Sequence, residues 1–376
     1  MRRIIFSILA SLLFVVTGFA KVSITVTNPI ALDRKSEMVE IKATDLKVDL
    51  KKNNFVLKNA NGQEVPYQLI LGKHKIVQLI IFQADVKGGK STVYTLVKGR
   101  PSVVKAKTFG RFVPERKDDF AWENDMAAYR MYGPALANEN PSNGVDFWSK
   151  ATSDLVINQR YRDDIYNNIS YHIDHGFGLD FYKVAHTMGC GGIAPYAFDS
   201  LWIGNHFNTY KVYENGPLRT RFSLVYDTVM IGKQIYKEVI TITIDAGSLL
   251  NKANVKFIGK NQKIQLAEGI FLHGGKGNLK YNVANGTMAY AEDAVSDAGV
   301  PEGRNYVGVF VPSKVTKRME KDDHALLITP YETGKQFSYY FGGGWSRWHF
   351  PTDNDWFNAL SNFAKFKHHP LKISIQ

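Results

Sequence analysis

The sequence contains one cysteine, Cys190, among 376 residues, so it can form no internal disulfide. Beyond the first 20 residues, it has no apolar run long enough to cross a bilayer as a helix. It also lacks a P-loop, a dinucleotide-binding fingerprint, a nucleophile elbow and any visible internal repeat. The fold must therefore depend on its hydrophobic core, and nucleotide-driven and serine-hydrolase chemistries have no motif to support them.

The first 20 residues are typical of a secretory signal peptide. A basic start (MRR) precedes an apolar run at 4–16, and small residues lead to Ala20, after which we expect cleavage. A bacterial lipoprotein would need a cysteine at that point, whereas the single cysteine is at position 190. We therefore predict a periplasmic or secreted protein that has no membrane span and no nucleic-acid partner.

Basic residues outnumber acidic ones, with 47 Lys and Arg against 35 Asp and Glu, which gives a formal charge of +12. Outside the cytoplasm, such a charge suits polyanions, and acidic polysaccharides are the obvious class. The alternative is that the charge serves only solubility. We expect an acidic oligosaccharide as the partner.

Alternation of apolar and polar residues predicts strands along most of the chain. Residues 21–98 contain short alternating runs separated by turn signals, which predicts an N-terminal antiparallel β-sandwich. A basic linker follows at 98–107. Longer alternating runs then predict a larger, supersandwich-like β-domain over 108–376. The predicted fold class is all-β, mainly antiparallel, with few short helices.

One helix is expected near the C-terminus. Thr352 and Asp355 resemble a capping box, and Trp356, Leu360 and Phe363 fall on one helical face. These three apolar side chains are expected to pack in the core, and residues 371–375 are expected to form a last strand.

The stretch from Tyr171 to Gly192, YHIDHGFGLDFYKVAHTMGCGG, is unlike a core segment. It gathers histidines and tyrosines, which transfer protons, together with aspartates that can orient a histidine. Its glycines permit sharp turns and close backbone approach. A polar loop without catalytic function is the alternative.

Three chemistries fit this stretch. His172, Asp174 and His175 could begin a divalent metal site, with calcium and zinc both open. Paired carboxylates could perform glycoside hydrolysis; the candidates are Asp174, Asp180, Glu123 and Asp125. Elimination on a uronic acid fits the residue types best, because it needs a base and an acid for proton transfer and a cation that neutralises the sugar carboxylate.

For elimination, we assign proton transfer to His172 and His175, with Tyr182 next, and carboxylate neutralisation to Arg130 and Lys183. Aromatic and basic residues elsewhere are candidates for substrate binding: Trp122, Arg160, Arg162, Trp345, Arg347 and Trp348. For several of these, a structural role is an equal alternative.

Four motifs resemble a secreted bacterial family known as a domain of unknown function: AWENDxxAYRMYGP (121–134), YHxDHGxGLDFYKV (171–184) with GCGG (189–192), ENGPLRTRFSLVY (214–226) and GWSRWHFPTDxDW (345–356). Members of that family occur in gene clusters that degrade acidic polysaccharides such as ulvan and pectin, and the chain is similar to an ulvan oligosaccharide dehydratase. The resemblance implies a β-rich fold and removal of water from a terminal uronic acid. Met188 stands where that family often has arginine, which implies a difference in specificity if the arginine contacts substrate.

The sequence therefore predicts a carbohydrate-active dehydratase or lyase. The alternatives are a non-catalytic carbohydrate-binding protein, which would need no histidine pair, and a glycoside hydrolase with two facing carboxylates.

Overall fold

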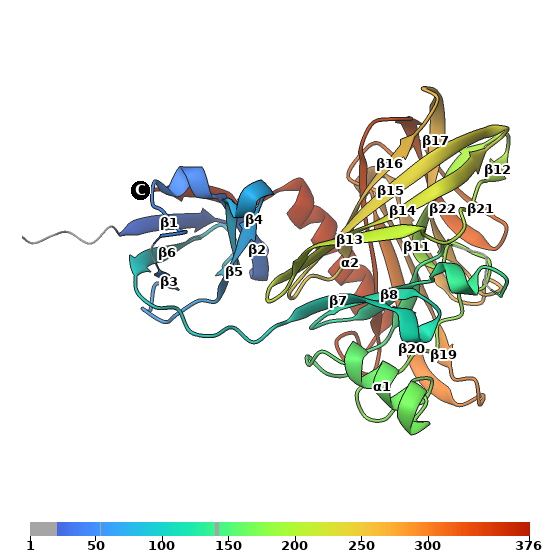
Figure 1. Cartoon of the computed structure of the whole chain (residues 1–376), viewed down its shortest axis with the longest axis horizontal. Helices are drawn as coiled ribbons and strands as arrows, with labels where there is room; N and C mark the ends of the chain where they lie inside the picture. The colour runs from blue at the N-terminus through green and yellow to red at the C-terminus, as the bar shows by residue number, and fades with distance from the viewer. Residues whose placement is uncertain (1–20, 53, 140–142) are drawn as a thin grey trace, which may run out of the picture.

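The computed structural model describes residues 21–52, 54–139 and 143–376 (Figure 1). The predicted signal peptide lies outside these residues. Within them, no helix is long and apolar enough to cross a membrane. The α-helices of the described chain are α1 (Ile157–Asn167) and α2 (Asp353–His368), and most other regular structure is antiparallel strand. The prediction of an all-β, mainly antiparallel fold is confirmed.

A small sandwich forms the N-terminal part. Its four-stranded sheet has the order β24-β1-β6-β3, and its three-stranded sheet has the order β2-β5-β4. The strands are β1 (Val22–Thr27), β2 (Arg34–Lys42), β3 (Phe55–Lys58), β4 (Tyr67–Leu71), β5 (Val77–Val86), β6 (Ser91–Lys98) and β24 (Lys372–Ile375). Apolar residues that alternate along these strands fill the space between the two sheets.

Strand β24 comes from the extreme C-terminus, yet it pairs with β1 in the small sandwich. The expected last strand is present, but the sequence-based division at 108–376 placed it with the larger domain. The chain therefore closes on itself, as Figure 1 shows, because α2 leads from the large body back to the small one.

The large body contains three sheets. The four-stranded sheet has the order β10-β9-β8-β7, the five-stranded sheet β12-β11-β17-β22-β21, and the eight-stranded sheet β13-β14-β15-β16-β23-β20-β19-β18. Their strands are β7 (Thr108–Val113), β8 (Asp119–Asn124), β9 (Ala128–Met131), β10 (Asp146–Trp148), β11 (Cys190–Ala197), β12 (Ser200–Leu201), β13 (Thr209–Asn215), β14 (Arg219–Ile231), β15 (Gln234–Asp245), β16 (Asn251–Ile258), β17 (Lys263–Phe271), β18 (Asn278–Asn282), β19 (Thr287–Val295), β20 (Pro301–Phe310), β21 (Lys317–Lys321), β22 (His324–Glu332) and β23 (Phe337–Trp345).

One continuous core lies between the eight-stranded sheet and the other two sheets. Phe222, Leu224 and Tyr226 of β14 point into it, as the alternation predicts. The four- and five-stranded sheets meet at a bridge between Val145 and Gly189. The two ends of the segment 145–189, which contains the His- and Tyr-rich stretch from Tyr171 onward, are therefore adjacent.

Helix α2 covers β19 and β20 on the outer side of the eight-stranded sheet. Thr352 and Asp355 form the expected capping box, in which each side chain bonds to the other residue's backbone N–H. Trp356, Leu360 and Phe363 are buried against the sheet, which confirms the predicted apolar face.

Candidate functional site

The loop between α1 and β11 carries the titratable residues, and glycines let it lie against β10. Gly178 has φ of +96°, and a Cβ there would lie 2.3 Å from the backbone oxygen of Ser149. Ser149 N–H donates to the Leu179 carbonyl at 3.0 Å, and Asp180 N–H donates to the Tyr171 carbonyl at 2.9 Å. Local backbone bonds therefore bring Tyr171 and Asp180 together without regular secondary structure.

Arg130, on β9, lies at the centre of a buried ionic network behind this loop. Its Nη2 contacts the carboxylates of Asp146 at 2.6 Å and Asp180 at 2.9 Å, and Nη1 donates to the Tyr171 hydroxyl at 3.2 Å. Asp119 lies 3.8 Å from Nη1. The guanidinium also lies near the rings of Tyr132, Trp148 and Tyr171, at 5.1, 5.0 and 5.7 Å from their centroids.

Burial raises the pKa of two carboxyls in this network despite the nearby arginine. Desolvation, followed by the charge of Asp146, raises the pKa of Asp180 to about 7, although Arg130 and His172 oppose the shift. Desolvation likewise raises the pKa of Asp119 to about 6, against Arg130 and Arg116. The positive charge of Arg130 is thus already matched by carboxylates within the protein.

His172 lies on the solvent side of the network. Its Nδ1 is 2.8 Å from the backbone carbonyl oxygen of Asp180 and 3.8 Å from the Asp180 carboxylate. A carbonyl oxygen only accepts hydrogen bonds, so Nδ1 must carry the proton. In the neutral form of the ring, Nε2 is then the unprotonated nitrogen, and 41% of the side chain is exposed. This is the arrangement that a general base requires.

His175 and Asp174 serve the loop differently. His175 Nε2 lies 3.0 Å from the Ser170 carbonyl, and Asp174 accepts hydrogen bonds from the backbone N–H groups of Gly176 and Gly178. Within the described ranges, no group of three or more His, Cys, Asp and Glu side chains is placed to hold a metal ion. The predicted metal candidates His172, Asp174 and His175 are thus not brought together as ligands.

Tyr182 lies in the same loop, two residues beyond Asp180, at the edge of a cavity of about 240 Å³. Phe181, Lys183, His273 and Glu292 also line this cavity. The Tyr182 hydroxyl is buried and has no hydrogen-bond partner among the described residues. Burial, with the nearby Cys190, Glu292 and Asp146, raises the pKa of Tyr182 well above its ordinary value, so the hydroxyl stays protonated.

His273 and Glu292 complete this cavity, and the sequence analysis missed both. His273 Nδ1 lies 3.0 Å from both carboxylate oxygens of Glu292, and Nε2 lies 2.7 Å from the Lys183 carbonyl. Burial alone would lower the pKa of His273, but the hydrogen bond and the charge of Glu292 have the larger combined effect, so the pKa of His273 is raised. Both ring nitrogens face acceptors, so a protonated ring satisfies the geometry best. These residues stand about 90 and 110 positions beyond Lys183 in the chain, and neither has a neighbouring motif that could have revealed it.

Asp146 connects the two halves of the site, because its charge acts on both Asp180 and Tyr182. Arg130 and His172 both lie next to Asp180, and Tyr182 and Lys183 line the neighbouring cavity. Lys183 is exposed, and its Nζ pairs with Asp297 at 3.0 Å.

Three of the six residues predicted to bind sugar are buried. Trp122 is fully buried and donates to Asn251, and Trp345 is buried and donates to the Glu302 carbonyl. Arg160 is buried and donates to the Ser149 and Phe177 carbonyls. These placements favour packing roles, because no ring face or guanidinium edge is open to a ligand.

The other three of these residues reach the surface. Arg162 is exposed, Arg347 pairs with Glu302, and the Trp348 ring packs at a tilt against the His349 ring. Within the described chain, no hydrogen bond or ring contact joins Arg347 or Trp348 to the loop at 171–184.

The carboxylates considered for hydrolysis are occupied. Glu123 pairs with Lys150 at 2.8 Å and accepts from the backbone N–H groups of Val156 and Ile157, so it anchors the start of α1. Asp125 accepts from the Gly247 N–H. Asp180 is buried and pairs with Arg130, and Asp174 accepts from the backbone N–H groups of Gly176 and Gly178.

The fold and site define a large antiparallel β-protein with a titratable loop over a buried ionic network. The chain belongs to the family described as "Domain of unknown function (DUF4861)", whose profile matches residues 26–373. A relative in Formosa agariphila, "Uncharacterized protein P7", is 29% identical over 375 residues, which cover 94% of this chain and 93% of the relative.

Two solved structures from Enterococcus faecalis are similar in shape. One is an alpha-mannosidase, with a TM-score of 0.46 and 8% identity over 95% of this chain. The other is a protein in the Glycosyl Hydrolase Family 38, with a TM-score of 0.48 and 8% identity over 95% of this chain. The chain spans about half the length of these structures, 46% and 47% respectively.

Proposed function

We propose that this protein is a carbohydrate-active enzyme that performs an elimination on a uronic acid of an acidic oligosaccharide, as a dehydratase or a lyase. The observation that carries the proposal is His172, whose Nδ1 lies 2.8 Å from the Asp180 carbonyl, and whose Nε2 has no hydrogen bond to the described residues. A non-catalytic sugar-binding protein has no need of a histidine held in one tautomer over a buried carboxyl.

In the proposed reaction, His172 Nε2 takes the proton from the sugar carbon next to the carboxylate. The electron pair of that C–H bond forms a double bond to the adjacent carbon, and the C–O bond on that carbon breaks. The oxygen leaves with its electron pair and takes a proton from Tyr182, whose buried hydroxyl would have to turn toward the cavity, so it departs as water or as a sugar alcohol. Transfer of the proton from His172 to the Tyr182 phenolate through solvent restores the enzyme.

An exposed cation stabilises the developing charge in this scheme. Lys183 lines the cavity and would exchange its partner Asp297 for the sugar carboxylate, whereas His273 stays paired with Glu292. Arg130 takes a positioning role, because Asp146 and Asp180 already occupy it. Asp180 in turn holds His172.

The mass of the products tests the proposal. Incubation of the chain with saturated oligogalacturonate and with other acidic oligosaccharides should give an oligosaccharide that has lost one water, or two fragments whose summed mass equals that of the substrate. Products that have gained one water would support hydrolysis, and unchanged substrates with measurable binding would support a binding protein.

A further inference from the structure

The outer face of the eight-stranded sheet carries rows of polar side chains next to the small sandwich. Strand pairing places Arg221 opposite Thr243, Thr243 opposite Lys252, and Lys252 opposite Tyr340. Directly opposite residues share one face of a sheet, about 5 Å apart. A second row, two residues along, contains Ser223, Thr241, Asn254 and Ser338. The face therefore offers cations, hydroxyls and an amide at sheet spacing, with an aromatic ring at one end.

This face forms the floor of a groove of about 300 Å³. Arg221, Thr243, Lys252, Asn254 and Tyr340 line the floor, and residues of β2, β4 and β5 form a wall. No residue of the 171–192 stretch lines the groove, so it is separate from the candidate site described above.

Arg219 joins the wall of the groove to its floor. This side chain, on β14, pairs with Glu40 of the small sandwich at 2.6 Å and with Asp245 of the large body at 2.6 Å. Both carboxylates line the groove, and both are committed to this arginine. The groove therefore lies at a boundary that ion pairs hold together, and Arg219 neutralises its two acidic side chains.

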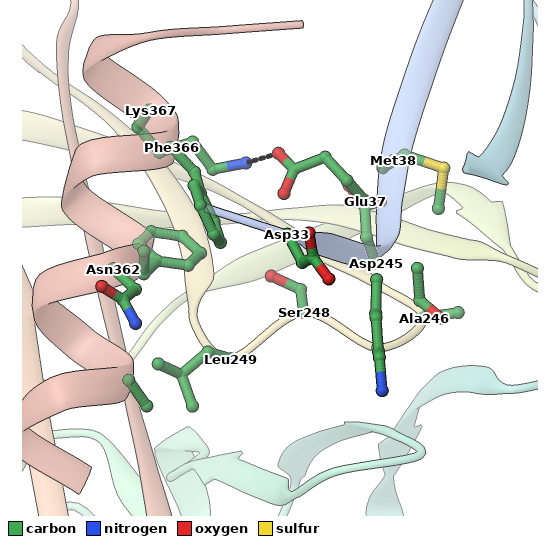
Figure 2. A pocket seen from close by; sticks show the side chains of 15 residues that line it. Asp33, Glu37, Met38, Asp245, Ala246, Ser248, Leu249, Asn362, Phe366 and Lys367 are labelled. Carbon is green, nitrogen blue, oxygen red and sulfur yellow. Dashed lines mark hydrogen bonds and ion pairs between the residues drawn. The ribbon is translucent and has the colours of Figure 1, made fainter. Parts of the chain in front are cut away.

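The remaining charge in the groove is positive. Arg221 pairs with Glu214 and Lys367 pairs with Glu37. Figure 2 shows the Lys367–Glu37 contact in a neighbouring cavity that shares Met38, Asp245 and Ser248 with the groove. Lys252, by contrast, is exposed and has no ion-pair partner among the residues that the structure describes.

We propose that this groove binds an anionic saccharide, with Lys252 as the partner of a sugar carboxylate or sulfate. The Thr243 hydroxyl and the Asn254 amide, which line the groove, suit sugar hydroxyls, and the Tyr340 ring offers an apolar surface. The choice of a saccharide rests on the proposed function. Such a groove would hold one part of a long chain while another part occupies the His172 site, which raises affinity for long substrates over short ones.

The test is binding by the full chain in the His172→Gln background, measured by calorimetry with saturated long-chain oligogalacturonate and with heparin as the carboxylated and sulfated probes. Loss of a charge-assisted contact in Lys252→Ala should weaken binding about tenfold for the preferred probe. Lys252→Arg should retain most of the affinity. Lys263→Ala removes an exposed lysine from β17, in another sheet, and should bind as the parent does.

Equal binding by Lys252→Ala and its parent would overturn the proposal, as would an equal loss in Lys263→Ala or failure of the parent to bind either probe. The outcome is separable from the proposed function. Binding that depends on Lys252, without elimination by the wild type, would support the groove as a binding site and contradict the proposed elimination. Elimination by the wild type, with binding independent of Lys252, would do the reverse.

Discussion

His172 Nδ1 lies 2.8 Å from the backbone carbonyl oxygen of Asp180, eight residues further along the chain. This contact sets the tautomer of the imidazole, because a carbonyl can only accept. It also joins an exposed side chain to the buried network of Arg130. The loop thus presents Nε2 as the ring nitrogen that can accept a proton, within reach of solvent.

Replacement of Tyr182 by phenylalanine tests whether its hydroxyl acts in catalysis or stabilises the fold. The hydroxyl is buried and has no partner in the described chain, so Tyr182→Phe should leave the free energy of unfolding unchanged or raise it by up to about 1 kcal/mol. If the hydroxyl protonates the leaving oxygen, kcat should fall about 100-fold or more. Thermal unfolding and initial rates on one preparation measure both.

A matched control for this variant is Tyr281→Phe, which removes a hydroxyl from β18 that bonds the Met319 carbonyl at 3.1 Å. It should keep full kcat. Wild-type kcat in Tyr182→Phe would assign the acid role to another group.

Removal of the Arg130 charge should destabilise the fold. Arg130→Met would leave Asp146 and Asp180 as unpaired carboxylates in a buried site, and the loss of one partner from such a network costs about 3–5 kcal/mol. Denaturant unfolding should show this loss. Arg162→Ala, which removes an exposed arginine on α1, should stay within about 0.5 kcal/mol of the wild type. Equal stability of the two variants would contradict the account of the network.

Two carboxyls inside the large core should make stability depend on pH. Burial raises the pKa of Glu238 and of Glu268 to about 8, from an ordinary value of 4.5. Between these values, the folded chain keeps protons that the unfolded chain loses, so stability should fall as pH rises through the window. The slope is at most about 1.4 kcal/mol per pH unit for each carboxyl.

The variant Glu238→Gln should remove part of this slope. We expect it to gain stability relative to the wild type as the pH is raised from about 5 to about 8, measured by denaturant unfolding. Glu320→Gln, at an exposed position of β21, is the control and should keep the wild-type slope. A Glu238→Gln slope as steep as that of the wild type would show that Glu238 ionises normally.

Much of the fold follows from local patterns. Alternation along β14 and β15 and the capping box of α2 depend on near neighbours, so the sequence predicts them. Helix α1 was not predicted, because its start is held by Glu123, more than 30 residues earlier, and not by a capping residue of its own. The pairing of β24 with β1 is equally remote from any local signal.

The candidate site was predictable in part for the same reason. His172, Tyr182 and Lys183 stand in one unusual stretch, so their types alone drew attention to them. His273 and Glu292 reach the cavity through sheet topology, and an isolated histidine after β17 has no pattern around it. Trp122 and Arg160 looked like ligand-binding residues because composition does not reveal that a hydrogen-bonded polar side chain is buried.

The most direct test of the central claim is the ultraviolet absorbance of the conjugated double bond in an unsaturated uronate. The wild type should produce a steady rise with at least one acidic oligosaccharide, and His172→Gln should slow it about 100-fold or more. His186→Gln, which removes another exposed histidine of the same loop, should retain the wild-type rate. An equal rise with His172→Gln would contradict the role of His172 as the base, and no rise with any acidic oligosaccharide would contradict elimination itself.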